Sequence, residues 1–293
     1  MKKNLIVITG GAGFIGSNMI KYLLNKTNYN LISLDNYFTG TKKNHVKNKR
    51  VKYIKGETKN ISNLFKNFKK KILVIFHFGE FSRIAQSFKY SAKCFDYNLV
   101  GTHNVLKFAY ENNIKIVYSA TSSMLGNKGA NQNLSPYTWC KAKNIEIIKN
   151  YNRWFKLKYE IVFFFNVYGE GQIKNNEMAA VIGIFESQYN SGKPLTVVRP
   201  GTQKRDFTHI NDITRGTYLV WRKSKNKEHM LGTNKRYTIL EVAKMFKSKI
   251  KMVKERPGER FNSQKIKGYA FKDLGFKPNI NIKNYIKNYI RKH

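Results

Sequence analysis

The chain has 293 residues, of which 41% are hydrophobic and 25% charged, and its 55 Lys and Arg against 17 Asp and Glu give a formal net charge of +38. This length suits one large α/β unit or two coupled ones. No apolar run approaches the length of a membrane span, and no signal-like region precedes the first apolar stretch. We therefore expect a soluble cytoplasmic protein that does not act at a membrane.

The positive charge is spread over the whole chain. Lysine accounts for 44 of the 55 basic residues and arginine for 11, and the lysines stand beside abundant asparagine. Clustered Lys and Arg would indicate phosphate neutralisation along a nucleic acid. This even distribution instead indicates a compositional bias on solvated faces. We expect nonspecific binding of polyanions at low salt, no specific nucleic-acid function, and a field that attracts anionic substrates.

The cysteines and histidines carry little information. Cys94 and Cys140 are isolated, and the six histidines are scattered. Neither residue type shows the spacing of a metal site or a disulfide framework. We expect reduced thiols and no structural metal.

The first organising pattern is LIVITGGAGFIG at residues 5–16, an apolar run followed by Gly10, Gly13 and Gly16. A helix-like stretch continues to Leu24, and Asp35 closes a second apolar run about 20 residues on. The run is typical of a buried parallel strand, and the glycines would allow a tight turn and close approach to a pyrophosphate. A glycine triplet alone could be a structural turn. With the strand, the helix and the distant acid, it predicts a dinucleotide site.

Strand and helix patterns alternate through the first half of the chain. This alternation predicts βαβ units and a Rossmann-type, doubly wound parallel sheet of the α/β class. Further strands are expected at residues 51–57, 71–79, 114–120 and 159–165, with helices at 61–69, 90–111 and 138–155.

The second half has shorter elements. A helix at 178–190 should end at Gly192 and Pro194, because these residues terminate helices. We expect this half to fold over the carboxyl edge of the sheet, where open α/β sheets bind their ligands. Its other elements are expected as a strand at 195–198 and helices ending at 221, at 239–249 and at 282–290.

Tyr137 and Lys141 stand four residues apart at the start of the predicted helix 138–155. This spacing puts both side chains on one helix face. An adjacent ammonium favours the phenolate form of a tyrosine, so the pair is a candidate general acid/base for a sugar hydroxyl. A surface i,i+4 pair is the alternative. We favour the catalytic interpretation because the pair follows a buried strand that ends in the hydroxyl cluster Ser119, Thr121, Ser122 and Ser123.

Several motifs now stand in a defined order. They are TGGAGFIG, LDN, HFGE, Asn98 in a long helix ending NLVGTHNVL, the hydroxyl loop, YTWCK, FFNVYGEGQ, RDFTHIND and ERPGE. Over nearly the whole chain this order resembles the extended short-chain dehydrogenases/reductases, specifically the nucleotide-sugar epimerase/dehydratase family. The consistency of so many motifs supports the resemblance.

The resemblance implies NAD as the cofactor. The acid at Asp35 would hold the adenosine ribose and disfavour a 2′-phosphate. Glu57 stands where an Asp usually meets the adenine. The residues implied to contact NAD are Gly10, Gly13, Phe14, Ile15, Gly16, Asp35, Asn36, Glu57, Phe78, Gly79, Asn98, Tyr137, Lys141 and Phe164.

The resemblance also assigns the catalytic and substrate sides. Thr121 would hydrogen-bond the sugar O4, Tyr137 would be the base and Lys141 its partner. Arg205 and Arg256 would bind the diphosphate as charge-assisted donors. The substrate side implied by the resemblance comprises Ser122, Asn166, Thr196, Val198, Arg205, Arg256, Glu259 and Ser263.

The loop after Thr121 bears on the reaction. Sugar dehydratases of the family carry an Asp-Glu pair there, whereas this chain has Ser122 and Ser123, and the Cys of the fucose-type epimerase-reductases is missing. The remaining residues suffice for oxidation at C4, turning of the 4-keto sugar and hydride return. The resemblance therefore implies an NAD-dependent 4-epimerase of a UDP-sugar. A dehydratase or reductase of another nucleotide sugar, and a nonenzymatic NAD-binding or polyanion-binding protein, remain alternatives.

The sugar is less constrained. Ser263 occupies the position that gates the C2 substituent in galactose-type epimerases, and its small size favours UDP-GlcNAc/GalNAc beside UDP-Glc/Gal. A UDP-uronate and a plain hexose remain alternatives, because this position is a single one. The loop from Gly126 to Tyr137 is shorter than usual in the family, which removes part of the expected substrate lid.

The same resemblance predicts the domains and the assembly. We expect an NAD-binding domain at 1–165 and 205–228 and a nucleotide-sugar-binding domain at 166–204 and 229–293. The family dimerises through the helices predicted at 90–111 and 138–155, so a homodimer is expected.

Overall fold

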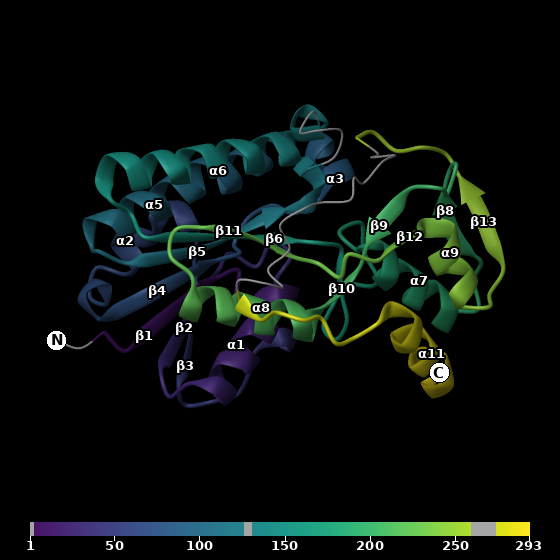
Figure 1. Cartoon of the computed structure of the whole chain (residues 1–293), viewed down its shortest axis with the longest axis horizontal. Helices are drawn as coiled ribbons and strands as arrows, with labels where there is room; N and C mark the ends of the chain where they lie inside the picture. The colour runs from purple at the N-terminus through teal and green to yellow at the C-terminus, as the bar shows by residue number, and fades with distance from the viewer. Residues whose placement is uncertain (1–2, 126–130, 259–273) are drawn as a thin grey trace.

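A seven-stranded sheet forms the centre of the computed structural model, which describes residues 3–125, 131–258 and 274–293 (Figure 1). The strand order is β11-β6-β5-β4-β1-β2-β3, and every neighbouring pair is parallel. The order reverses between β1 and β4, as in doubly wound folds. The strands are β1 (Leu5–Thr9), β2 (Asn30–Asp35), β3 (Val51–Lys55), β4 (Ile72–His77), β5 (Lys115–Thr121), β6 (Tyr159–Phe164) and β11 (Glu228–Leu231).

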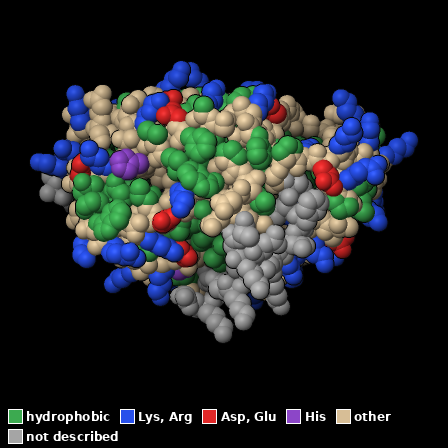
Figure 2. All heavy atoms as spheres, turned by 90° about the horizontal axis from the view of Figure 1, so that it is seen from above, with side chains coloured by type: hydrophobic (Ala, Val, Ile, Leu, Met, Phe, Trp, Pro, Cys, Tyr) green, Lys and Arg blue, Asp and Glu red, His purple; other side chains and the backbone are tan. Residues whose placement is uncertain are grey.

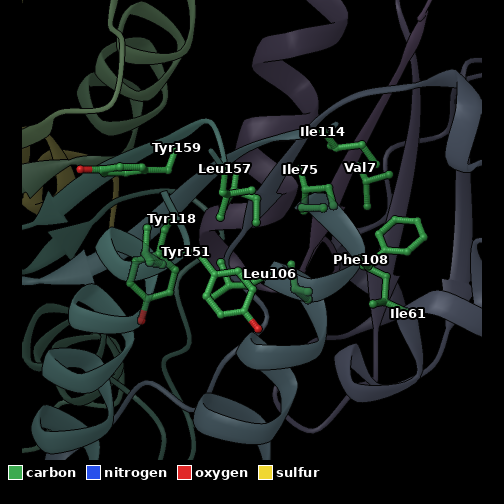
Figure 3. Packing of buried hydrophobic residues seen from close by; sticks show 14 of the residues in the cluster. Val7, Ile61, Ile75, Leu106, Phe108, Ile114, Tyr118, Tyr151, Leu157 and Tyr159 are labelled. Atoms are coloured by element: carbon green, nitrogen blue, oxygen red, sulfur yellow. The ribbon is translucent and has the colours of Figure 1, made fainter. Parts of the chain in front are cut away.

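Helices cover both faces of the sheet (Figure 1). On one face lie α2 (Ile61–Leu64), α5 (Gly101–Glu111) and α6 (Pro136–Phe155), and on the other α1 (Phe14–Lys26) and α8 (Ile210–Lys223). The strands are therefore apolar on both sides. In β1, Val7 packs toward α5, while Ile6 and Ile8 pack toward α1 and α8. Figure 3 shows the hydrophobic core between the sheet and helices α2, α5 and α6. Val7 and Ile75 come from the strands, and Leu106 and Tyr151 come from the helices.

The second half of the chain packs as a smaller α/β group beside the sheet, on the right in Figure 1. It has a core of its own, which contains Phe185, Val197, Phe246 and Ile286. Its elements are α7 (Val181–Asn190), β8 (Leu195–Val198), β9 (Lys204–Asp206), β12 (Arg236–Thr238), α9 (Ile239–Met245), β13 (Ile250–Val253) and α11 (Ile282–Lys292). The short pair β7 (Val167–Tyr168) and β10 (Thr208–His209) joins it to the sheet.

The predicted Rossmann-type α/β class is confirmed, with local differences. The helix expected at 90–111 consists of α4 (Ser91–Phe95), a π-helical turn η4 (Asp96–Val100) and α5. The helix expected at 61–69 was too long, because α2 ends at Leu64. Residues 229–231, expected in the second domain, continue β11 of the central sheet. In the part of the chain that the structure describes, no helix has the length and apolarity of a bilayer span.

His77 connects three elements of the sheet's carboxyl edge. Its ring nitrogens lie 2.7 Å from the Thr9 hydroxyl of β1 and 2.9 Å from the Thr102 hydroxyl of α5. The side chain is fully buried. Burial lowers the pKa of His77 from 6.5 to about 4. The native imidazole is therefore neutral at physiological pH.

This neutral histidine should make the fold acid-sensitive. Between pH 6.5 and pH 4 the unfolded chain binds a proton at His77 that the folded chain does not. The contribution of His77 to the free energy of unfolding is therefore complete above about pH 6.5 and is lost as the pH falls toward 4. We predict that His77 accounts for about 2 kcal/mol of the stability lost between pH 7 and pH 5. Urea unfolding of the protein and of His77→Gln at both pH values would measure this difference. Equal pH dependence of the two proteins would contradict a buried neutral His77.

Candidate active site

One cavity of about 440 Å³ lies between the carboxyl edge of the sheet and the smaller group. It brings together the residues expected at both the cofactor and the substrate side. Of these, the following line it: Gly10, Gly13, Phe14, Ile15, Gly16, Asp35, Asn36, Glu57, Phe78, Gly79, Thr121, Ser122, Tyr137, Lys141, Phe164, Asn166, Thr196, Val198, Arg205 and Arg256. Glu259 and Ser263 lie outside the described residues.

The glycine loop has the geometry of a dinucleotide cradle. Gly10 has a φ of +71°, and a Cβ there would lie 2.9 Å from the backbone of Gly79. A Cβ on Gly16 would lie 2.1 Å from the Gly10 carbonyl oxygen. Gly13 is the N-cap of α1 and gives the helix no side-chain cap. The first N–H groups of α1 are thus available to an anion, so the loop fits the pyrophosphate of NAD.

Asp35, at the end of β2, connects two loops of this cradle. Its carboxylate accepts hydrogen bonds from Ala12 N at 2.9 Å and Tyr37 N at 2.8 Å. Burial raises the pKa of the Asp35 carboxyl, and these backbone donors oppose the shift. Asn36 and Glu57 line the cavity nearby, with Glu57 paired to Lys59 at 2.9 Å. An acid at this place fits an adenosine ribose.

Asn98 is not among the residues that line the cavity. It is fully buried behind the lining, where its amide exchanges two hydrogen bonds with the backbone of Phe81, at 2.7 and 3.0 Å. Asn98 therefore holds the loop that follows β4. The structure places it in a supporting position for the cofactor channel.

Helix α6 presents Tyr137 and Lys141 to the cavity. Ser135 and Thr138 form a capping box at its start, and Pro136 occupies the first turn. These residues fix where the helix begins and hence where Tyr137 points. Both Tyr137 and Lys141 are buried. The positive end of the helix dipole favours negative charge on Tyr137, and Thr121 stands at the end of neighbouring strand β5.

Glu80 is the site residue that sequence reasoning missed. Its carboxylate lies 2.5 Å from the Lys141 ammonium, and both side chains are almost completely buried. The same carboxylate accepts hydrogen bonds from Asn144 at 2.8 Å and from Tyr118 at 3.1 Å. Burial and this carboxylate raise the pKa of Tyr118. The signal was the acid in HFGE, a charged residue directly after an apolar strand.

The ion pair restricts Lys141. Its ammonium also donates to the Ser119 carbonyl oxygen, so two protein oxygens hold it in place. Removing one partner of a buried pair leaves an uncompensated charge at a cost of several kcal/mol. Lys141 is therefore a fixed and largely neutralised cation.

The smaller group supplies the expected substrate side. Arg205 on β9 is buried, and Arg256, after β13, is exposed at the cavity rim. Thr196 and Val198 of β8 line the same region. Asn166 donates to the Asp206 carbonyl at 2.8 Å, which ties the end of β6 to β9. Two arginines with an open strand edge fit a nucleoside diphosphate.

The fold and this site define a dinucleotide-binding protein of the Rossmann type with a Tyr-Lys pair beside the cofactor cradle. Residues 6–239 match the model of the NAD dependent epimerase/dehydratase family. The chain therefore belongs to that family, and NAD is its cofactor.

Relatives within the family differ in reaction. A putative UDP-glucose 4-epimerase of Methanocaldococcus jannaschii is 29% identical, over 98% of this chain and 97% of its own length. UDP-glucuronic acid decarboxylase 6 of Arabidopsis thaliana is 27% identical, over 95% of this chain and 85% of its own. The crystal structure of UDP-glucuronic acid 4-epimerase from Bacillus cereus superposes with a TM-score of 0.87 at 24% identity, covering 100% and 99% of the two chains. That structural likeness concerns the fold.

The glycine cradle leads to a direct test. We predict that Gly16→Ala lowers NAD affinity roughly 10- to 100-fold, because the added methyl collides with the Gly10 carbonyl and distorts the loop. Calorimetric titration of nucleotide-free protein with NAD measures this. Gly192→Ala controls for a general loss of stability, since a φ of +63° strains an alanine there although nothing lies within 4 Å of a Cβ and the residue is outside the cavity. Unchanged affinity in Gly16→Ala would show that the loop does not hold NAD.

Proposed function

We propose that this protein epimerises C4 of a UDP-sugar in an NAD-dependent reaction. The observation that carries the proposal is the meeting of Thr121, Tyr137 and Lys141 with the glycine cradle in one cavity. The alternative sugar dehydratase needs a free carboxylate beside the sugar. Among described residues, the carboxylates that line the cavity are Asp35, Glu57 and Glu80. The first two belong to the cofactor end, and Glu80 is bound to Lys141.

Each group of residues in the cavity has a distinct role in the proposed reaction. Bound NAD would supply the hydride acceptor and donor for C4. Tyr137 would take the O4 proton and later return it, with the N-terminus of α6 favouring its phenolate. Thr121 would orient O4 through its hydroxyl. Arg205 and Arg256 would hold the diphosphate while the sugar turns to present its other face.

UDP is the nucleotide that we propose. The resemblance to the putative UDP-glucose 4-epimerase over nearly the whole chain supports this choice. The pairs UDP-Glc/Gal and UDP-GlcNAc/GalNAc are both candidates, and Ser263, which favours the N-acetylated pair, lies outside the described residues.

Substitution of the base tests the proposal. Tyr137→Phe should lower epimerisation by roughly 10²- to 10⁴-fold, because no group remains to carry the O4 proton, while NAD stays bound. Purified protein without added cofactor would be incubated with UDP-Glc, UDP-GlcNAc and UDP-glucuronate, and the products separated by chromatography. Tyr218→Phe, on α8 outside the cavity, is the matched control.

Each class of alternative has its own signature in the same assay. Interconversion of C4 epimers without net NADH supports the proposal. Accumulation of a stable keto product would indicate a dehydratase or reductase instead. Absence of turnover, with salt-sensitive DNA binding at physiological ionic strength, would indicate a nonenzymatic protein. Turnover that survives in Tyr137→Phe would show that the base is another residue.

We also propose a homodimer through the helices α4, η4 and α6. Large apolar side chains are exposed on this face, which appears as green groups in Figure 2. They are Phe95, Val100, Trp139, Trp154 and Phe155, and Trp154 is 58% exposed. Several exposed large apolar side chains on one face are typical of an interface.

A charge on this face should disrupt the dimer. We predict that Trp154→Glu converts the dimer to monomers, because a carboxylate would be desolvated in the interface. Light scattering coupled to size-exclusion chromatography gives the mass. Asn288→Glu adds the same charge to the exposed surface of α11 and should leave the dimer intact. A monomeric parent protein would refute the assembly, and a dimeric Trp154→Glu would refute this face.

A further inference from the structure

Arg83 is a cationic side chain of the cavity that the proposed mechanism does not use. It follows β4 and is the N-cap residue of α3 (Ile84–Lys89). Its side chain lines the cavity together with Thr121, Ser122 and Tyr137. Burial lowers the pKa of the Arg83 guanidinium, and the nearby Tyr137 phenol raises it. The Tyr137 backbone N–H donates to the Ser87 hydroxyl of α3 at 3.3 Å, so the helix that Arg83 caps lies against the reacting end of the cavity.

The hydrogen bonds of Arg83 position it without neutralising it. Its Nε donates to the Met178 carbonyl at 2.5 Å, and one terminal nitrogen donates to the Ser82 carbonyl at 2.8 Å. Across the described ranges 3–125, 131–258 and 274–293, no carboxylate forms an ion pair with Arg83. Arg83 is half-buried, and a guanidinium that keeps some contact with water does not require a carboxylate partner from the protein. The hydrogen bonds to neutral carbonyls orient the Arg83 guanidinium in the cavity. They do not cancel its positive charge, which can therefore interact with an anionic ligand.

The other cation at this end of the cavity is already compensated. The Lys141 ammonium lies 2.5 Å from the buried Glu80 carboxylate. Among the described residues, Arg83 is therefore a cation without a carboxylate partner that an anionic group at the reacting end would meet. Arg205 and Arg256 come from the smaller group, on β9 and after β13, beside Thr196 and Val198. Those two arginines suit the diphosphate. Arg83 would then interact with a negative charge on the sugar.

We infer that Arg83 selects a sugar that carries a carboxylate on the carbon next to the reacting C4, as in a hexuronate. This inference rests on the proposed 4-epimerase function. Guanidinium and carboxylate match in shape and charge, and such bonds are roughly twice as strong as neutral ones. The Ser82 hydroxyl lies 3.4 Å from a terminal nitrogen of Arg83 and suits a further hydrogen bond to the same carboxylate. UDP-hexuronates are the substrate class that this arrangement fits.

The test compares UDP-glucuronate with UDP-glucose, which differ at C6. The expected result is preferential epimerisation of UDP-glucuronate, with kcat/KM for it reduced on the order of 10- to 100-fold in Arg83→Met. The loss for UDP-glucose should be much smaller, so the ratio of the two kcat/KM values falls. Arg83→Lys keeps the charge without the fork and should restore part of the ratio.

A matched control separates a local contact from the general field of this basic protein. Arg222→Met removes one charge from the exposed surface of α8, outside the cavity, and should leave the ratio unchanged. Three results would overturn the inference. They are equal use of both substrates by the parent protein, equal losses for both in Arg83→Met, and a lower affinity of Arg83→Met for UDP alone. The last result would place Arg83 on the diphosphate.

Binding measurements keep this inference distinct from the proposed reaction. Calorimetry of the NAD-loaded Tyr137→Phe protein gives the affinities for UDP-glucuronate and UDP-glucose without turnover. Tighter binding of UDP-glucuronate, lost in the Tyr137→Phe/Arg83→Met double variant, supports the role of Arg83 even if no epimer forms in the parent protein. Equal affinities together with normal epimerisation of UDP-glucose would refute the inference and leave the proposed function standing.

Discussion

Parallel pairing is the constraint on which this molecule depends. Because all seven strands run in one direction, β1, β2, β4, β5 and β6 end at the same edge of the sheet. That edge collects residues from distant parts of the chain, from the glycine loop to Thr121. The apolar faces of the strands bury the sheet between two helical layers, so the edge is held rigidly. The cavity forms where the smaller group covers it.

A polar network supports this edge from within. His77, Thr102 and Glu80 connect the end of β4 with α5, and Glu80 continues the network to Lys141 of α6. Buried polar groups are tolerated when all of them have partners, and then they specify one arrangement. Here the arrangement sets the position of the Tyr137-Lys141 helix relative to the cofactor cradle. Changes at His77 or Thr102, which do not line the cavity, would therefore act on it from behind its lining.

Charge is distributed unevenly along the cavity. Asp35 and Glu57 lie at the end that suits the adenosine, whereas Arg205, Arg256 and Arg83 follow toward the substrate side. Lys141 contributes little net charge because of Glu80. Acidic residues at one end suit the uncharged adenosine of NAD, and the arginines at the other end suit an anionic substrate. The proposed preference for an acidic sugar follows from the same distribution.

The sequence by itself determined the alternation of strands and helices, the glycine cradle, and the spacing of Tyr137 and Lys141, because these depend on local periodicity. It did not reveal β11, whose four residues have no distinctive pattern. Only the tertiary structure decided that Glu80 pairs with Lys141, 61 residues away, and that Asn98 supports Phe81 instead of lining the cavity. It also decided that Arg83 faces the cavity without a carboxylate partner among the described residues. Such partners meet only where the parallel strands end, and no local pattern encodes which side chains meet there.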